Sequence, residues 1–226
     1  SQTTADDLER LLHIPRERID IVPLGVSAEF QPQPEARQQE VCRKYGLPSS
    51  FFLFVGTVEP RKNLPRLIEA WTLLAPWCPH DLVIAGRRGW KVAPVQRAVH
   101  QSHHAHRIHF PGHVAQEDLS ALFSAAHAFV WPSLFEGFGL PPLEAMACGT
   151  PVITSNLSSV PEVVGDAART VNPQDVVSIS DALRELTDDA LLCERLSKAG
   201  LARAGRFTWA RTARLTLASY RLAMEG

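Results

Sequence analysis

The pattern of this chain is clearest in the segment Phe129-Val-Trp-Pro-Ser-Leu-Phe-Glu-Gly-Phe-Gly-Leu-Pro-Pro-Leu-Glu-Ala-Met-Ala-Cys-Gly-Thr-Pro-Val-Ile153. An apolar strand is followed by a loop with Gly137 and Gly139, then by a helix and a second apolar strand. Pro141 and Pro142 suit a first helical turn, where a missing N–H costs little. In open α/β sheets, ligands bind at loops that follow the carboxyl ends of strands. The segment therefore predicts a parallel sheet with a ligand-binding loop at its rim.

The same alternation extends in both directions from this segment. Short apolar runs occur at Phe51–Val55, Leu82–Ala85, Ile108–Phe110, Ala128–Trp131 and Val152–Thr154, with a weaker one at Arg169–Val171. The helical stretches are Leu64–Leu74, Val95–His103, Glu117–Ala126, Pro142–Ala147, Asp175–Leu186 and Ala190–Ala204. Strands that are apolar throughout, separated by amphipathic helices, are typical of a parallel sheet covered on both faces. We therefore predict a doubly wound α/β fold.

Residues before and after this pattern suggest four units. Residues 1–24 contain a predicted helix, Ala5–Leu12, and a predicted strand, Arg18–Val22, and are interpreted as the remnant of a preceding domain. Residues 25–50, rich in proline, are interpreted as an interdomain linker. Residues 51–206 form the predicted α/β domain. Residues 207–226 form a last helix with Thr208 as its N-cap.

Composition limits the classes of function. The chain has 226 residues and a net charge of -1, which gives no general attraction to nucleic acid or to an anionic membrane. No apolar run approaches the roughly 20 residues that span a bilayer, and the first residues do not resemble a signal peptide. The sequence starts with Ser1 and not with Met, so we expect it to be part of a longer chain. Its four cysteines lie far apart, which favours reduced thiols in the cytoplasm.

The glycine loop has the chemistry of an anion site. Residues without side chains allow backbone N–H groups to approach a ligand, and the following helix end offers donors and a positive dipole to a phosphate. Glu136 and Glu144 flank the loop, and each carboxylate can accept hydrogen bonds from a pair of hydroxyls. A simpler interpretation stays open for each residue: Glu144 could stabilise the helix start, and Glu136 could be an ordinary loop residue.

A second motif supports the first. Phe51-Phe-Leu-Phe-Val-Gly-Thr-Val-Glu-Pro-Arg-Lys-Asn-Leu64 combines a buried strand, a glycine turn at Gly56 and a basic pair, Arg61 and Lys62, before a helix. A departing diphosphate gathers negative charge, and fixed cations can stabilise it. The alternative is a solvated basic pair at a helix start.

Together the two motifs resemble the signature of the retaining glycosyltransferases of family four, which have the two-domain GT-B fold. The resemblance implies that this chain is the C-terminal, donor-binding, Rossmann-like half of such an enzyme. Glu136 would then contact hydroxyls of the transferred sugar, and Glu144 would hold the ribose. The backbone of the loop, Gly137, Phe138, Gly139 and Leu140, would face the sugar and the phosphates.

The basic loop departs from the family pattern at one position. Many members have arginine where this chain has Thr57, whereas Lys62 keeps its place and Arg61 is the expected second cation. The resemblance thus makes Glu136, Lys62 and Arg61 the catalytic residues, and Gly56, Thr57 and the backbone of Val114 further contacts to the donor.

The implied reaction transfers a sugar from a nucleotide diphosphate donor with retention of configuration. The basic loop resembles that of bacterial mannosyltransferases, so GDP-mannose is the first expectation, and a UDP-sugar remains open. The expected acceptor is a glycan or a lipid-linked glycan, bound mainly by the N-terminal domain. A cytoplasmic location at the inner face of the membrane, with peripheral association of the full-length enzyme, is compatible with this function.

No metal or other cofactor is expected. The chain has no Asp-x-Asp motif, and His100 and His104, four residues apart, have no clear carboxylate or thiolate partner. Three other classes of protein share parts of this pattern. A sugar-nucleotide epimerase should lack the complete loop motif, a non-catalytic nucleotide-sugar-binding module would not need Glu136, and a phosphorylase-like enzyme would need a lysine that binds pyridoxal phosphate.

Overall fold

The computed structural model describes the backbone of residues 1–225 and the side chains of residues 1–224. Its centre is a six-stranded parallel sheet with the strand order β3-β2-β1-β4-β5-β6. The strands are β1 (Phe51–Val55), β2 (Asp81–Ala85), β3 (Ile108–Gly112), β4 (Ala128–Trp131), β5 (Val152–Ser155) and β6 (Arg169–Val171). The predicted α/β fold is confirmed, and every strand predicted from Phe51 onward is present.

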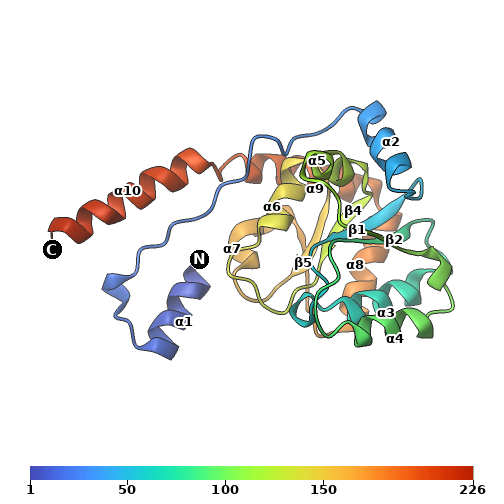
Figure 1. Cartoon of the computed structure of the whole chain (residues 1–226), viewed down its shortest axis with the longest axis horizontal. Coiled ribbons are helices and arrows are strands. Elements are labelled where there is room, and N and C mark those ends of the chain that lie inside the picture. The colour runs from blue at the N-terminus through green and yellow to red at the C-terminus, as the bar shows by residue number, and fades with distance from the viewer. Residues whose placement is uncertain (226) are drawn as a thin grey trace.

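Helices cover both faces of the sheet (Figure 1). One face carries α3 (Leu64–Leu74), α4 (Ala93–Gln101) and α8 (Val176–Asp188). The other carries α5 (Gln116–Ala125), α6 (Leu140–Ala147) and α9 (Ala190–Ala204). The strand order reverses between β1 and β4, which are neighbours in the sheet but not in the chain. Ligands of doubly wound sheets bind at this switch point, beyond the carboxyl ends of the strands.

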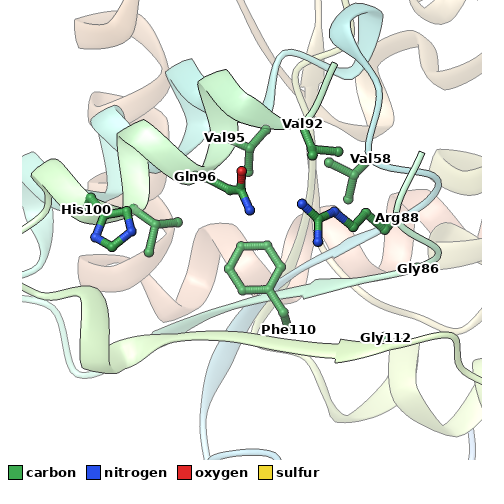
Figure 2. A pocket seen from close by; sticks show the side chains of 10 residues that line it. Val58, Gly86, Arg88, Val92, Val95, Gln96, His100, Phe110 and Gly112 are labelled. Atoms are coloured by element: carbon green, nitrogen blue, oxygen red, sulfur yellow. The ribbon is translucent and has the colours of Figure 1, made fainter. Parts of the chain in front are cut away.

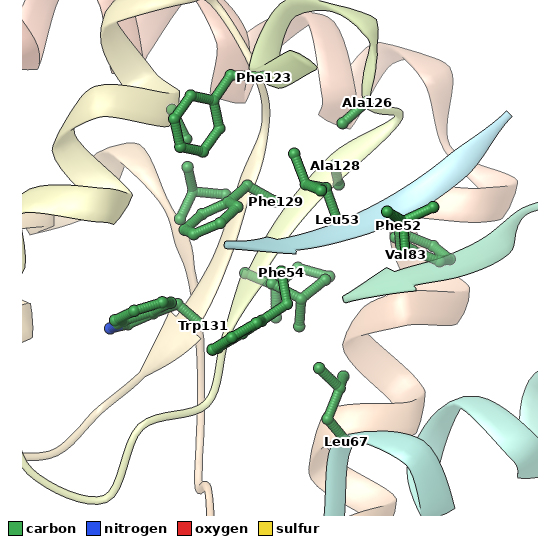
Figure 3. Close-up of a cluster of buried hydrophobic side chains, with 14 of the residues drawn as sticks. Phe52, Leu53, Phe54, Leu67, Val83, Phe123, Ala126, Ala128, Phe129 and Trp131 are labelled. Atoms are coloured by element: carbon green, nitrogen blue, oxygen red, sulfur yellow. The ribbon is translucent and has the colours of Figure 1, made fainter. Parts of the chain in front are cut away.

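The sheet is apolar because it is covered on both sides. Phe51, Phe52, Leu53 and Phe54 of β1 are all completely buried, although their side chains alternate between the two faces. At the carboxyl end of the sheet the rings of Phe54 and Trp131 stack with centroids 4.9 Å apart (Figure 3). These stacked rings lie next to the loops that follow β1 and β4.

Three segments lie outside the sheet and its covering helices: α1 (Gln2–Leu12), α2 (Glu35–Lys44) and α10 (Trp209–Glu225). Figure 1 shows α10 extending away from the sheet. Helix α2 lies within the predicted linker and is fastened to α5 by Asp118, which is 1% exposed and accepts hydrogen bonds from Arg37, Lys44 and Tyr45. The predicted limits of the four units stay predictions.

The strand predicted for residues 18–22 is wrong. The segment contains the end of a 3-10 turn, η1 (Arg16–Arg18), and then extended chain. A strand needs a hydrogen-bonded neighbour, and in the described part of the chain the segment finds none; the nearest pairing is a single bridge between Val26 and Thr208. There the chain passes so close to the start of α10 that a Cβ on Gly25 would lie 2.3 Å from the backbone nitrogen of Trp209.

A short helix, α7 (Val160–Val164), was not predicted. Its single turn is too short to produce a helical periodicity in the sequence. In the described part of the chain, no helix has both the length and the apolar character needed to span a bilayer.

Candidate functional site

The loop after β1 carries the basic pair to the rim of the sheet. The chain leaves β1 at Gly56, forms the 3-10 turn η2 (Pro60–Lys62) and enters α3 through Asn63. Asn63 has a left-handed backbone (φ 60°), and its Nδ2 donates to the carbonyl oxygens of Pro132, at 3.1 Å, and Pro173, at 2.6 Å. Because these carbonyls follow β4 and β6, one side chain joins three loops at the carboxyl edge.

Glu136 is the centre of a charged cluster that joins the two motifs. Its Oε1 accepts hydrogen bonds from Lys62 Nζ at 2.7 Å and from Ser133 Oγ at 2.6 Å. Its Oε2 accepts from a terminal nitrogen of Arg61 at 2.5 Å, and Arg61 Nε contacts Glu59 at 2.6 Å. The three residues predicted to be catalytic therefore lie together, although 74 residues separate Lys62 from Glu136 in the chain.

Burial and pairing determine the charges in this cluster. Lys62 is only 5% exposed, and burial lowers its pKa although Glu136 opposes that shift. Burial also acts to raise the pKa of Glu136, but hydrogen bonds from Lys62 and Ser133 outweigh it, and the pKa lies below its ordinary value. Glu136 is thus held as a carboxylate at neutral pH. The ammonium of Lys62 also lies 4.0 Å from the ring centroid of Trp131, a cation–π contact from below.

Two serines fix the backbone of the glycine loop. Ser158 Oγ and Ser159 Oγ each donate to the carbonyl oxygen of Glu136 at 2.7 Å, and Ser159 is also 3.0 Å from the carbonyl of Phe138. Ser158 itself has a left-handed backbone (φ 61°), which directs its hydroxyl back toward the loop. The loop is therefore held by the segment after β5 as well as by its own ends.

Two glycines shape the loop. A Cβ on Gly137 would meet no atom within 4 Å, and Gly139 adopts φ 115° as the N-cap of α6. Helix α6 starts at Leu140, two residues before the predicted start at Pro142. Phe138 packs its ring against Phe207 at 5.9 Å, so its side chain points away from the rim. These features fit a loop that presents backbone donors to an anion.

Glu144 lies in surroundings unlike those of Glu136. It is partly buried, and no hydrogen bond to its carboxyl group is found within the described residues. Burial raises its pKa to about 7, and Glu29 adds to the shift. A carboxyl group with this pKa is half protonated at neutral pH and keeps its hydrogen-bonding capacity for another partner.

The remaining predicted contacts line a pocket over β1, β2 and β3. Its volume is about 420 Å³. Its walls include Gly56, Thr57, Arg87, His113, Val114 and Gln116. Gly56, Thr57 and Val114 are thus brought together in one pocket wall, where Val114 is 3% exposed.

A second pocket, of about 360 Å³, lies between α4 and β3 (Figure 2). Its walls are mainly apolar, with Val95 and Phe110 facing each other and Arg88 at one end. It shares Gly86 with the first pocket. None of the residues predicted to bind the donor lines it, and no part of the site described above depends on it.

Sequence reasoning missed several residues that build the site. Ser133 is adjacent to the predicted loop, but the hydroxyls of Ser158 and Ser159 and the amide of Asn63 act across the fold. Serine and asparagine are common in loops, so no pattern in the sequence distinguishes these from other loop residues. Among the described residues, no group of three or more His, Cys, Asp or Glu could hold a metal ion. Independence from metal stays a prediction.

The fold and the site together define a Rossmann-like α/β unit with a basic pair and a glycine loop at its switch point. Comparison with known proteins gives the particular family. The chain belongs to the glycosyl transferases group 1 family, whose model matches residues 39–203.

The relatives are bacterial glycosyltransferases. The O-antigen chain mannosyltransferase B of Escherichia coli is 38% identical over 225 residues, which are 98% of this chain and 59% of that protein. The MMP alpha-(1->4)-mannosyltransferase of Mycolicibacterium hassiacum is 30% identical over 229 residues, 99% of this chain and 53% of that protein. The chain thus spans less than two thirds of the length of these relatives.

Solved structures share the fold at lower identity. A glycosyltransferase of Rickettsia africae has a TM-score of 0.89 at 18% identity, over 100% of this chain and 62% of that one. Anabaena HepE, in complex with UDP and glucose, has a TM-score of 0.88 at 18% identity, over 98% of this chain and 61% of that one. At this identity the similarity demonstrates the fold alone.

Proposed function

We propose that this chain is the donor-binding half of a retaining, metal-independent glycosyltransferase that transfers mannose from GDP-mannose to a growing glycan. The observation that carries the proposal is the cluster of Lys62, Arg61 and Glu136 next to the glycine loop at the switch point. The mannosyltransferases among its relatives support the sugar, and the polysaccharide context follows from the O-antigen enzyme among them. HepE, a neighbour in fold, binds UDP and glucose, which supports a nucleotide-sugar donor in general.

In the proposed reaction, the bond between the anomeric carbon and the diphosphate oxygen breaks. A bond from that carbon to the acceptor oxygen forms on the same face, and the acceptor proton passes to the departing diphosphate. Lys62 and Arg61 stabilise the negative charge that develops on the leaving group, each by about 2–4 kcal/mol. Glu136 orients the sugar and stabilises the positive charge that develops on its ring.

The pairing of Lys62 with Glu136 is compatible with both roles. An ammonium has three N–H donors, so Lys62 can keep its bond to Glu136 and still donate to a phosphate oxygen. The carboxylate then serves to hold the ammonium in place as well as to bind the sugar. The acceptor is proposed to bind mainly to an N-terminal domain, so this chain alone should bind donor but transfer sugar slowly.

Titration calorimetry with GDP-mannose, GDP, UDP and ADP tests the proposal. We expect GDP to bind more tightly than UDP or ADP. Lys62→Met should weaken GDP binding about 30-fold or more, because a phosphate contact is lost. Glu136→Gln should weaken GDP-mannose binding more than GDP binding: both ligands lose the carboxylate that holds Lys62, but only GDP-mannose carries the mannose that Glu136 contacts.

The control is Lys198→Met on α9, since that side chain is 74% exposed and, among the described residues, forms an ion pair with the nearby Glu194. It should leave all affinities unchanged. If Lys62→Met bound GDP as tightly as the wild type, the phosphate assignment would be wrong. If UDP bound more tightly than GDP, the donor would be a UDP-sugar and not GDP-mannose. A β-linked product from a longer protein that contains this chain would overturn retention.

A further inference from the structure

The carboxylate of Glu162 holds the start of helix α1. Its Oε2 accepts a hydrogen bond from the backbone N–H of Gln2 at 2.6 Å, and its Oε1 accepts from the N–H of Thr3 at 2.8 Å. The hydroxyl of Thr3 donates to the same Oε1 at 2.6 Å. Three donors from the first turn of α1 therefore converge on one side chain that lies about 160 residues further along the chain.

Glu162 is exposed, and its carboxylate satisfies donors at the helix start. The N–H groups of a first helical turn have no partner within the helix and lie at the positive end of the helix dipole. A carboxylate satisfies two of them and complements the dipole. Burial acts to raise the pKa of Glu162, but hydrogen bonds from Thr3 and Gln2 outweigh it and lower the pKa, so the group is ionised at neutral pH. The other donor of this turn, the N–H of Thr4, is capped by Ser1.

Glu162 belongs to the same short segment that holds the glycine loop. Ser158 and Ser159, three and four residues earlier, donate to the carbonyl oxygen of Glu136. On the other side, the carbonyl oxygen of Glu162 accepts a hydrogen bond from Arg203 of α9 at 2.6 Å. Residues 158–162 are thus fixed to the domain and contact the catalytic loop at one end and α1 at the other.

A direct contact completes the connection. The hydroxyl of Thr4 in α1 donates to the carbonyl oxygen of Gly137 at 3.3 Å. Next to it, Ala5 of α1 is 1% exposed, so the first turn of the helix packs closely and is not merely tethered. Helix α1 therefore contacts the loop that carries Glu136 directly.

From this geometry we infer that Glu162 is a positioning residue: it fastens α1 to the Glu136 loop, so that the chain preceding the α/β unit and the sugar-binding loop move as one body. The consequence for sugar binding rests on the proposed function, because it needs the loop to contact the sugar. The coupling between α1 and the loop does not depend on that function.

Hydrogen exchange measured by mass spectrometry on the whole chain tests the coupling. Glu162→Gln keeps the size of the side chain, but it removes the charge and replaces one acceptor oxygen by a donor. We expect about tenfold faster exchange in the first turn of α1 and also at the loop amide of Glu136, which donates to Ser158 Oγ at 3.2 Å, at unchanged global stability. Thr3→Val, which removes one of the three hydrogen bonds, should give a smaller change at both places.

Glu185→Gln is the matched control. Glu185 also accepts two hydrogen bonds, from Arg169 at 2.6 and 3.0 Å, but it lies on α8, on the other face of the sheet. It should leave exchange in α1 and in the loop unchanged. Faster exchange in α1 alone, with the loop as in the wild type, would reduce Glu162 to a local helix cap and overturn the coupling. Unchanged exchange at both places would overturn the contact itself.

Calorimetry supplies the functional measurement. In Glu162→Gln we expect GDP-mannose to bind about three- to tenfold more weakly and GDP to lose less affinity, because GDP-mannose contacts the loop through its sugar as well as its phosphates. A purely structural defect would weaken both ligands by the same factor, and that result would refute the positioning role. If neither ligand bound the wild type, the proposed function would fail, while the exchange experiment would still decide the coupling.

Discussion

Replacing Glu144 by glutamine should make the chain more stable at pH 8 and at the same time worse at binding its donor. The pKa of this carboxyl group is raised from 4.5 to about 7, first by burial and then by Glu29. A carboxyl group whose pKa is higher in the folded than in the unfolded state favours folding in its protonated form. Its contribution is therefore complete below pH 4.5 and is lost as the pH rises through 7.

The magnitude follows from the shift. A difference of roughly 2.5 pKa units corresponds to about 3 kcal/mol between the two protonation states. Because glutamine does not ionise, Glu144→Gln should recover about 2–3 kcal/mol at pH 8 and much less at pH 5. For a chain of this size, that recovery raises the melting temperature by about 5 °C or more. Thermal unfolding at the two pH values measures it directly.

Donor binding should depend on pH in the opposite direction. If the carboxylate accepts hydrogen bonds from the ribose hydroxyls, the ionised form binds. With a pKa near 7, about one eleventh of the molecules are ionised at pH 6 and about ten elevenths at pH 8. The affinity should thus be about tenfold higher at pH 8. Near pH 7, binding should release about half a proton, which calorimetry in two buffers of different ionisation enthalpy can detect.

GDP-mannose is the right ligand for this measurement, because its esterified phosphates do not titrate near neutral pH as the terminal phosphate of GDP does. Glu144→Gln should bind more weakly at pH 8 and show no pH dependence from this source. Equal affinities at pH 6 and pH 8 in the wild type, or a variant that binds as tightly as the wild type at pH 8, would refute the ribose role. Glu144 would then be only a buried group near the start of α6.

Three further predictions concern stability. His80 is buried, and burial is the main reason that its pKa falls to about 4. Its contribution to the free energy of unfolding should be fully present above pH 6.5 and fall by up to about 3 kcal/mol as the pH drops to 4. In acid denaturation, His80→Phe should show a smaller loss of stability over this range. Gly86→Ala should lower the free energy of unfolding in urea by about 3 kcal/mol, because Gly86 has φ +137° and an added Cβ would lie 2.0 Å from the carbonyl oxygen of Gly56. Gly46→Ala, where the Cβ would lie in open space, should cost about 1 kcal/mol. Asp118→Ala should cost about 2–3 kcal/mol and release α2, seen as faster hydrogen exchange there, because Lys44 and Tyr45 lose this partner and Arg37 is left with Glu40. Unchanged exchange in α2 would contradict this assignment.

The sheet could be predicted from the sequence because its strands are buried on both faces. A run such as Phe51–Val55 is apolar at every position, and helix periodicity separates one run from the next. The helices that cover the sheet could be predicted because their apolar residues recur with the helical period. The short helix α7 and the chain from Arg18 to Val22 were not predicted correctly, since a single turn has no period and a strand depends on a neighbour.

The site could be predicted where a residue type with suitable chemistry directly follows a recognisable strand. Lys62 and Glu136 lie directly after apolar strands, and the carboxyl ends of parallel strands meet at one edge of the sheet. The mutual pairing of these two residues was not predicted, because each was assigned to a different part of the donor. Ser158, Ser159 and Glu162 act through the three-dimensional arrangement of the loop after β5, which local sequence does not reveal.

The pairing of Lys62 with Glu136 determines the charge of both groups. A buried ammonium without a partner would lose its proton readily, and a buried carboxylate without one would gain a proton. Held together at 2.7 Å, with Trp131 below the ammonium, each keeps the other charged. The carboxylate proposed to bind the sugar and the ammonium proposed to bind the leaving group are therefore not independent parts of the site. Each charge is available to a donor because the other is present, and removing either one alters both.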